Sequence, residues 1–131
     1  MALSGKAFSE QEMCNLLRQI ASALDHLHSH NLVHLDVKPE NIYVTPTEQY
    51  KIGDFGLICT ADEKSFEEGD SRYMPKDLFC EFPELTKADI FSLGCSVYEL
   101  VSLFPSQSNH TKDSWHGTAK RRGGMVCYSG G

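Results

Sequence analysis

Four polar residues at two nearby places in the chain have the chemistry needed to transfer a phosphoryl group. Residues 34–41 are His-Leu-Asp-Val-Lys-Pro-Glu-Asn, and the triplet Asp-Phe-Gly begins at Asp54, thirteen residues after Asn41. Asp36 can accept a proton, and Lys38 can neutralise charge on a phosphate. Asn41 and Asp54 offer oxygen atoms, the ligands that Mg²⁺ prefers. Either half alone is a weak signal, but the pair at this spacing predicts a phosphoryl-transfer site.

The residues around these motifs indicate which elements must position them. Ser-Glu-Gln-Glu at 9–12 matches a capping box, and apolar residues then recur every three or four positions. We therefore expect an amphipathic helix over 9–30. The first motif should be a loop, because Pro39 has no amide hydrogen. Two β-rich runs, at 42–44 and 50–52, predict a small hairpin.

The rest of the chain predicts a turn, an irregular segment, a helix and a tail. Residues 32–33 should begin a buried turn, and residues 54–77 should be irregular and acidic in the middle. A second helix is expected from about Lys87 to Phe104. Its apolar residues surround most of the helix, so it should be buried on most sides. Residues 105–131 are rich in Ser, Asn, Gly and Lys, and we expect them to be disordered.

Composition and charge argue against some classes of partner and location. The net charge of −6 argues against a surface for nucleic acid or anionic membranes. No stretch approaches about 18 uninterrupted apolar residues and no signal-peptide pattern is present, so we expect an intracellular protein with no transmembrane segment in this chain. Five cysteines without C-x-x-C spacing predict reduced thiols. A metal site is not favoured at the histidine cluster, since no carboxylate or cysteine completes it; its members are His26, His28, His30 and His34.

The motifs resemble those of the C-terminal lobe of eukaryotic protein kinases, and within that superfamily the Wee/Myt group. That group inhibits cyclin-dependent kinases by phosphorylating them. The chain has His-Leu-Asp at 34–36, where most kinases have His-Arg-Asp. Residues 67–74 resemble the group's Glu-Gly-Asp-Ser-Arg stretch, and residues 88–94 match the start of its central helix. The resemblance implies a mainly α fold with a small β-hairpin, the C-terminal lobe of the α+β protein kinase fold, in a partial domain over 1–104.

The resemblance also implies a role for each site residue. Asp36 would take the proton of the substrate hydroxyl, and Lys38 would neutralise the phosphoryl group in transfer. Asn41 and Asp54 would hold Mg²⁺ against the phosphates of ATP, which Lys38 would also contact. Tyr43 takes the place of a residue that packs beneath adenine, although a strand aromatic can equally belong to the core.

By the same comparison, three other residues would align the loops. Phe55 and His34 resemble the pair of rings that stacks the metal-binding loop on the catalytic loop. Asp89 would accept backbone hydrogen bonds from the catalytic loop. Its alternative role, as an N-cap of the second helix, is compatible with that one.

Two departures from the usual kinase pattern affect the mechanism. Leu35 replaces an arginine that elsewhere pairs with a phosphorylated activation loop, so we expect no ordering of that kind here. Asp70 stands where most serine/threonine kinases have a threonine. A carboxylate there can pair with Lys38, as in the Wee arrangement, which suggests a tyrosine acceptor. Lys38 itself resembles serine/threonine kinases, and of the two signals we favour Asp70.

The 131 residues contain no G-x-G-x-x-G loop and no Val-Ala-Ile-Lys-like lysine. We therefore expect the N-terminal lobe to be missing and the isolated chain to be inactive. By the same resemblance, the helices that normally follow the central helix are absent too, so we expect an apolar face to be left open. The main hypothesis is an ATP- and Mg²⁺-dependent kinase of the Wee/Myt type. Its partner would be a protein substrate, a cyclin-dependent kinase, and its location the nucleus rather than the cytoplasm. The alternatives are a generic serine/threonine kinase and a non-catalytic, kinase-derived binding module.

Overall fold

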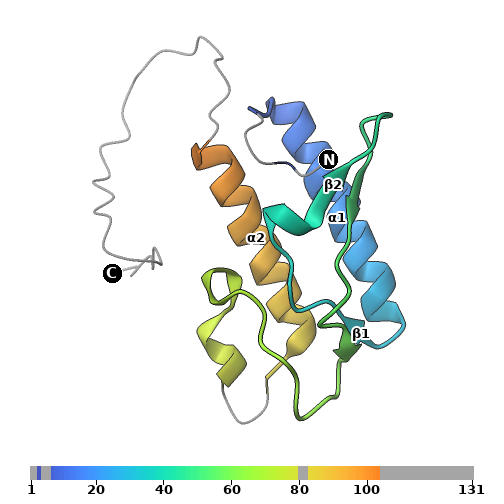
Figure 1. Cartoon of the computed structure of the whole chain (residues 1–131), viewed down its shortest axis with the longest axis vertical. Helices are drawn as coiled ribbons and strands as arrows, with labels where there is room; N and C mark the ends of the chain where they lie inside the picture. Colours follow the sequence, from blue (N-terminus) through green and yellow to red (C-terminus); the bar gives the residue numbers. More distant parts are fainter. Residues whose placement is uncertain (1–2, 4–6, 80–82, 104–131) are drawn as a thin grey trace, which may run out of the picture.

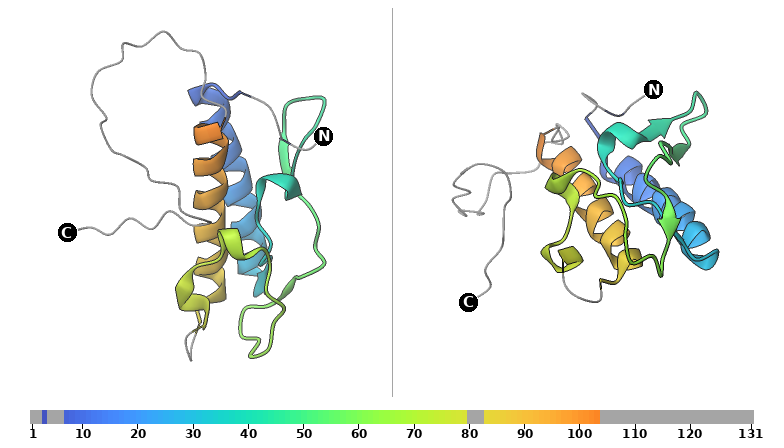
Figure 2. Two further views of the ribbon diagram at one scale, coloured as in Figure 1. Left: turned by 60° about the vertical axis from the view of Figure 1, so that its left-hand side comes forward. Right: turned by 60° about the horizontal axis from the view of Figure 1, so that its bottom comes forward.

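Two long helices and two small antiparallel sheets form the part of the chain that the structure describes. The computed structural model describes residues 3, 7–79 and 83–103. Helix α1 spans Glu10–Ser29 and helix α2 spans Leu85–Leu103. The two helices lie side by side and run in opposite directions, and the loops and strands between them cover one side of the pair (Figure 1; Figure 2).

Helix α1 begins where the capping box predicts. The Glu12 N–H donates to Ser9 Oγ at 3.2 Å, and the Ser9 N–H donates to Glu12 Oε2 at 2.9 Å. Each of the two side chains therefore accepts a backbone N–H that the start of the helix would otherwise leave unpaired. Just past the helix, Asn31 has a φ of 58°, a left-handed conformation that asparagine tolerates and that ends the helix. The buried face of α1 consists of Leu16, Ile20 and Leu24.

The predicted hairpin is confirmed. Strands β2 (Ile42–Val44) and β3 (Tyr50–Ile52) are antiparallel, with Val44 opposite Tyr50. The Tyr50 N–H donates to Gln19 Oε1 at 2.8 Å, which fastens the hairpin to helix α1. The first motif, residues 34–41, immediately precedes β2. The hairpin therefore fixes the C-terminal end of the loop that contains this motif.

The buried turn predicted at residues 32–33 is instead a short strand. Strand β1 (Leu32–Val33) pairs with β4 (Cys59–Thr60), with Val33 opposite Cys59. The Ala61 N–H also donates to the Asn31 carbonyl at 2.9 Å, which lengthens the contact. Two-residue strands carry no periodicity, and these partners are far apart in the sequence, so no local pattern could reveal the pairing.

Helix α2 starts at Leu85, slightly earlier than the expected Lys87. Its buried side includes Leu93, Ser96 and Leu100. The expectation of burial on most sides is wrong within the described residues, because five large apolar side chains of this helix are about half exposed: Ile90, Phe91, Tyr98, Val101 and Leu103. An open apolar face of the kind that the sequence analysis also expected is therefore present. Phe104 and the tail expected at 105–131 lie outside the described residues.

The segment after Asp54 is largely irregular, as predicted, but it contains strand β4 and two short 3₁₀ turns. Turn η2 spans Ser71–Tyr73 and turn η3 spans Lys76–Phe79. This segment packs on an apolar cluster beneath the first motif. The buried members of that cluster are Val33, Leu35, Met74, Leu78, Leu85 and Ala88. The loop with the first motif therefore rests on the segment that follows the second motif and on the start of α2.

Candidate active site

Asp36 and Asn41 are joined directly, which brings two of the four predicted site residues together. Asn41 ends the 3₁₀ turn η1 (Pro39–Asn41) and is buried. Its Nδ2 donates to the Asp36 carbonyl at 2.8 Å and to Asp36 Oδ2 at 3.0 Å. Both hydrogen bonds use the side-chain amide nitrogen, so within the described part of the chain Oδ1 of Asn41 remains available to another group.

Lys38 lies between two carboxylates. Its Nζ is 3.6 Å from Asp36 Oδ1 and 3.6 Å from Asp70 Oδ2. The Asp70 N–H also points to Asp36 Oδ1, at 3.4 Å. The pairing of Asp70 with Lys38 that the sequence suggests is confirmed. A flexible ammonium near two carboxylates and open to solvent on one side can move toward a third anion without losing all its charge partners.

Asp89 anchors the loop from below. The side chain is fully buried, and its Oδ2 and Oδ1 accept the N–H groups of His34 and Leu35 at 2.9 and 2.8 Å. His28 Nε2 lies 2.8 Å from Oδ2. The predicted hydrogen bonds to the loop are confirmed. The N-cap alternative is wrong, because α2 begins at Leu85 and Asp89 lies inside the helix.

His34 connects the two motifs. Its Nδ1 accepts the Asp36 N–H at 3.2 Å, and its Nε2 donates to the Gly53 carbonyl at 2.8 Å. These partners fix the neutral tautomer that carries its proton on Nε2. The His34 and Phe55 rings meet edge to face, with centroids 5.5 Å apart, so the predicted ring contact is confirmed.

The structure places Asp54 beside this group, although its carboxylate does not contact the other site residues. The Gly53 N–H donates to the Asn41 carbonyl at 2.9 Å, which brings the start of the second motif against the end of the first. Asp54 has a φ of 55° and is exposed. Among the described residues, its carboxylate is bonded only to the Gly56 N–H, at 3.4 Å.

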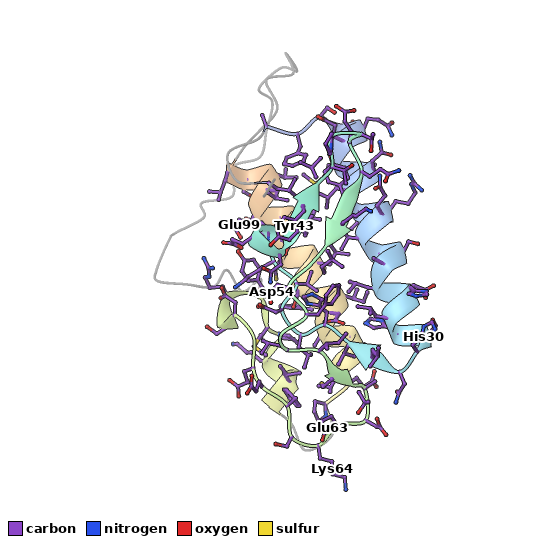
Figure 3. All side chains as sticks on the ribbon, turned by 45° about the vertical axis from the view of Figure 1, so that its right-hand side comes forward. His30, Tyr43, Asp54, Glu63, Lys64 and Glu99 are labelled. Carbon is purple, nitrogen blue, oxygen red and sulfur yellow. The ribbon has the colours of Figure 1, made fainter. Side chains whose placement is uncertain are left out.

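Tyr43 lies next to the same backbone. Its side chain is 40% exposed on β2, and a Cβ added to Gly53 would come within 2.8 Å of the ring. Figure 3 shows the side chain of Tyr43 on β2 and that of Asp54 at the start of the second motif. The large exposed fraction rules out a fully buried core position for Tyr43.

Arg72 is a site residue that sequence reasoning missed. Its Nε and Nη2 donate to the two oxygens of Asp70, at 3.0 and 2.7 Å, and Nη2 lies 3.7 Å from Glu40. Hydrogen bonds from the Arg72 side chain, with the nearby Lys38 charge as a smaller cause, lower the pKa of Asp70 to about 2. Asp70 is therefore ionised at neutral pH and keeps a negative charge beside Lys38. The signal in the sequence was an aspartate, Asp70, in the capping position just before the 3₁₀ turn that contains Arg72.

Tyr73 forms a second contact that the sequence analysis missed. Its hydroxyl donates to the Glu99 carboxylate, and its carbonyl accepts from Ser92 Oγ at 2.6 Å. Burial, and then the hydrogen bond to Glu99, raise the pKa of the Tyr73 phenol. Since Ser92 and Glu99 belong to α2, these bonds fasten η2 to the same helix that anchors the first loop.

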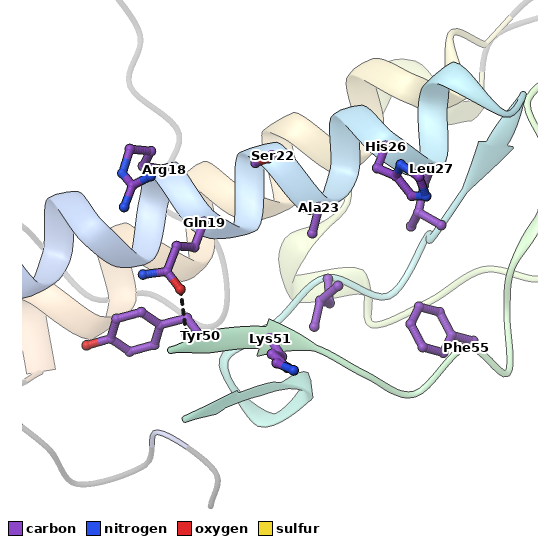
Figure 4. A pocket seen from close by; sticks show the side chains of 10 residues that line it. Arg18, Gln19, Ser22, Ala23, His26, Leu27, Tyr50, Lys51 and Phe55 are labelled. Atoms are coloured by element: carbon purple, nitrogen blue, oxygen red, sulfur yellow. Dashed lines mark hydrogen bonds between the residues drawn. The ribbon is translucent and has the colours of Figure 1, made fainter. Parts of the chain in front are cut away.

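A separate cavity of about 590 Å³ lies between α1 and β3 (Figure 4). Neither Asp36, Lys38 nor Asn41 lines it, whereas Phe55 stands at one end. Its remaining lining residues are Arg18, Gln19, Ser22, Ala23, His26, Leu27, Tyr50, Lys51 and Ile52.

The family comparison agrees with this geometry. The protein kinase domain family matches residues 2–126. The chain belongs to the protein kinase family. Within the described part of this kinase chain, no helix is long and apolar enough to cross a bilayer. Among the same residues, no group of three or more His, Cys, Asp or Glu side chains is arranged to hold a metal ion.

The similar proteins include Wee-type kinases. A Wee1-like protein kinase of Arabidopsis thaliana is 46% identical over 99 residues, which cover 74% of this chain and 20% of that protein. The membrane-associated tyrosine- and threonine-specific cdc2-inhibitory kinase wee-1.3 of Caenorhabditis elegans is 40% identical over 84% of this chain and 16% of its own length. The serine/threonine-protein kinase Nek3 of Oryza sativa subsp. japonica is 41% identical over 76% of this chain and 17% of its own.

The predicted membership of the kinase family and the resemblance to Wee-type kinases are confirmed. The kinase chain spans about a fifth of the length of the curated relatives it matches, or somewhat less.

Proposed function

We propose that the described residues are the C-terminal-lobe part of a protein kinase domain and that the longer polypeptide transfers the γ-phosphoryl group of ATP to a protein hydroxyl. The observation that carries the proposal is the convergence of Asp36, Lys38 and Asn41 on one loop, with Asp70 completing the charge pattern. Phosphoryl transfer requires positioning and charge neutralisation more than covalent chemistry, and this group supplies both.

Asp36 is the residue positioned to receive the hydroxyl proton. Asn41 Nδ2 donates to one carboxylate oxygen, and the Asp70 N–H and Lys38 approach the other. These contacts hold the carboxylate in one orientation, which is what a general base needs in order to aim the attacking oxygen. Lys38 then shifts its charge toward the phosphoryl group as negative charge accumulates there.

Asn41 and Asp54 fit a magnesium site. Among the described residues, the Asn41 side chain uses only its Nδ2 in hydrogen bonds, which leaves the neutral Oδ1 for the ion, and the exposed Asp54 carboxylate offers anionic oxygens. When bound, Mg²⁺ neutralises the phosphates of ATP. Tyr43, half-exposed over Gly53, would provide an aromatic face for the adenine ring.

Within the kinases, the Wee/Myt type with a tyrosine acceptor is the more specific proposal. Asp70 occupies the position next to Lys38 that a threonine usually fills, and Arg72 keeps it ionised. A plant relative is named as a Wee1-like protein kinase, and a nematode relative as a membrane-associated tyrosine- and threonine-specific cdc2-inhibitory kinase. We therefore propose a cyclin-dependent kinase as substrate. We also propose the nucleus as the location, following the Wee type and not the membrane-associated type.

The test uses the longer polypeptide that contains this chain, purified and incubated with Mg-ATP and a cyclin-dependent kinase. We expect phosphotyrosine on the substrate and a fall in kcat of about 10²–10⁴-fold in Asp36→Asn. Asp25→Asn is the matched control, because Asp25 is an exposed aspartate on α1. Equal activity of Asp36→Asn and wild type would contradict the proposal.

A serine/threonine kinase outside the Wee group is the second candidate. Lys38 follows the serine/threonine pattern, and the rice Nek3 kinase is about as similar to this chain as the nematode Wee-type kinase. The same assay distinguishes the two, since hydrolysis of the product followed by phosphoamino-acid separation would then yield phosphoserine or phosphothreonine and no phosphotyrosine.

A further inference from the structure

Gly69 lies where the segment after the second motif passes over the loop of the first motif, residues 34–41. A Cβ added to this glycine would clash with the Leu35 carbonyl oxygen, because their separation would be well below the 3.0 Å that a Cβ keeps from other heavy atoms. The same Cβ would lie 3.2 Å from Asp36 Oδ1. The φ of Gly69 is outside the left-handed region. The position therefore does not need glycine for its backbone conformation, only for the close approach.

The obstructing carbonyl cannot move away easily. Leu35 has a φ of 63°, and its N–H is bound to the buried Asp89 carboxylate at 2.8 Å. Its side chain is buried in the apolar cluster with Met74 and Leu85. Because the backbone and the side chain of Leu35 are both held, a side chain at position 69 would displace the segment that contains Gly69.

The contacts next to Gly69 have little room for such a displacement. The Asp70 N–H reaches Asp36 Oδ1 at 3.4 Å, and Asp70 Oδ2 reaches Lys38 Nζ at 3.6 Å. Both distances are already near the outer limit for a hydrogen bond or an ion pair. A shift of close to an ångström would break the bond to Asp36 and separate the charges.

We propose that Gly69 is a positioning residue: the absence of a side chain there sets the register between the two segments that places Asp70 against Asp36 and Lys38. Gly69 acts through these groups and touches no substrate. The inference deepens the proposed kinase function and rests on it for the kinetic consequence, whereas the structural consequence does not depend on activity.

Gly69→Ala tests the inference, and Gly94→Ala is the matched control. Gly94 lies in α2, and nothing stands within 4 Å of where its Cβ would be. Both variants are made in the longer polypeptide, and thermal unfolding checks that each folds. Amide hydrogen exchange is then compared over residues 34–41 and 67–74. We expect faster exchange in both segments of Gly69→Ala and unchanged exchange in Gly94→Ala.

Steady-state kinetics provide the second measurement. For Gly69→Ala we expect kcat to fall at least 10-fold with the KM for ATP changed less than about 2-fold, since the affected contacts act on the transferring group. Wild-type exchange in both segments of Gly69→Ala, or a KM for ATP raised as much as kcat is lowered, would overturn the inference. If the wild-type polypeptide transferred no phosphate, the proposed function would fail, and the exchange measurement would still decide the role of Gly69.

Discussion

Arg72 and Asp70 show how one exposed cation can set the charge of a partly buried neighbour. Arg72 donates a bidentate pair of hydrogen bonds to Asp70, and its side chain is largely exposed to solvent. The Asp70 carboxylate, in contrast, is mostly covered and faces Lys38. The arginine supplies hydrogen bonds that the ionised carboxylate needs after it has lost most of its water. Lys38 therefore meets an anion that stays ionised across the physiological pH range.

This pair predicts a defined dependence of stability on pH. The pKa of Asp70 is about 2 in the folded chain, below the value of about 3.9 in an unfolded chain. Its stabilisation is therefore fully present above about pH 4 and is lost as the pH falls through about 2. We compare the free energy of unfolding in urea at about pH 4 and about pH 2. Between these two pH values, we expect the free energy of unfolding of wild type to fall by about 0.5–1 kcal/mol more than that of Asp70→Asn. The difference is modest because Arg72 is exposed and its charge is screened by solvent.

Asp25→Asn, on the exposed face of α1, is the control for this measurement and should retain the wild-type pH dependence. The prediction fails if wild type and Asp70→Asn lose the same free energy of unfolding between the two pH values.

Helix α2 organises the site because one of its carboxylates accepts hydrogen bonds from a distant loop. Asp89 takes two backbone N–H groups of the loop and a contact from His28 of α1, so it connects three parts of the chain. Further along the same helix, Ser92 and Glu99 hold Tyr73. The loop that carries Asp36 and the segment that carries Asp70 are thus fastened to one rigid element, which keeps their spacing constant.

Removing the Asp89 carboxylate should therefore cost far more than removing an exposed one. In Asp89→Ala, two buried N–H groups lose their acceptor, and we expect the free energy of unfolding to fall by about 3–5 kcal/mol. Asp25→Ala should change it by less than about 0.5 kcal/mol. The measurement is chemical unfolding followed by circular dichroism. A loss below about 1 kcal/mol in Asp89→Ala would show that the loop does not depend on this anchor.

The elements with local signals could be predicted, and those that depend on distant partners could not. The capping box of Ser9 and Glu12 and the β-rich runs of the hairpin lie within a few residues of what they determine. The pairing of β1 with β4 depends on backbone groups about 27 residues apart, and two-residue strands give no pattern.

The same distinction holds within the candidate site. The contacts of Asp36, Lys38 and Asn41 follow from one short motif, and the partners of Asp89 followed from the family resemblance. The bond between Tyr73 and Glu99 joins two elements whose docking no residue spacing indicates. The obstruction at Gly69 comes from a carbonyl oxygen, and every residue has one, so the sequence offers no sign of it.

At the scale of the whole molecule, the 131 residues contain a base and metal-ligand candidates but no glycine-rich phosphate loop. Residues 1–131 alone should therefore have little affinity for ATP, since the phosphates would be held from one side only. We expect purified residues 1–131 to transfer no more labelled phosphate from Mg-ATP than their own Asp36→Asn variant. Robust transfer by residues 1–131 that is lost in that variant would refute this expectation.

The position of Asp89 also has a consequence for the order in which the polypeptide folds. Helix α1 and the hairpin are neighbours in sequence and can associate early, whereas α2 must close a loop of more than fifty residues before it docks on α1. Until it does, the N–H groups of His34 and Leu35 lack the carboxylate that accepts them in the folded chain, and the motif that contains them is not yet anchored to α2. During synthesis from the N-terminus, the segment with Asp36 would thus leave the ribosome long before it acquires its working geometry.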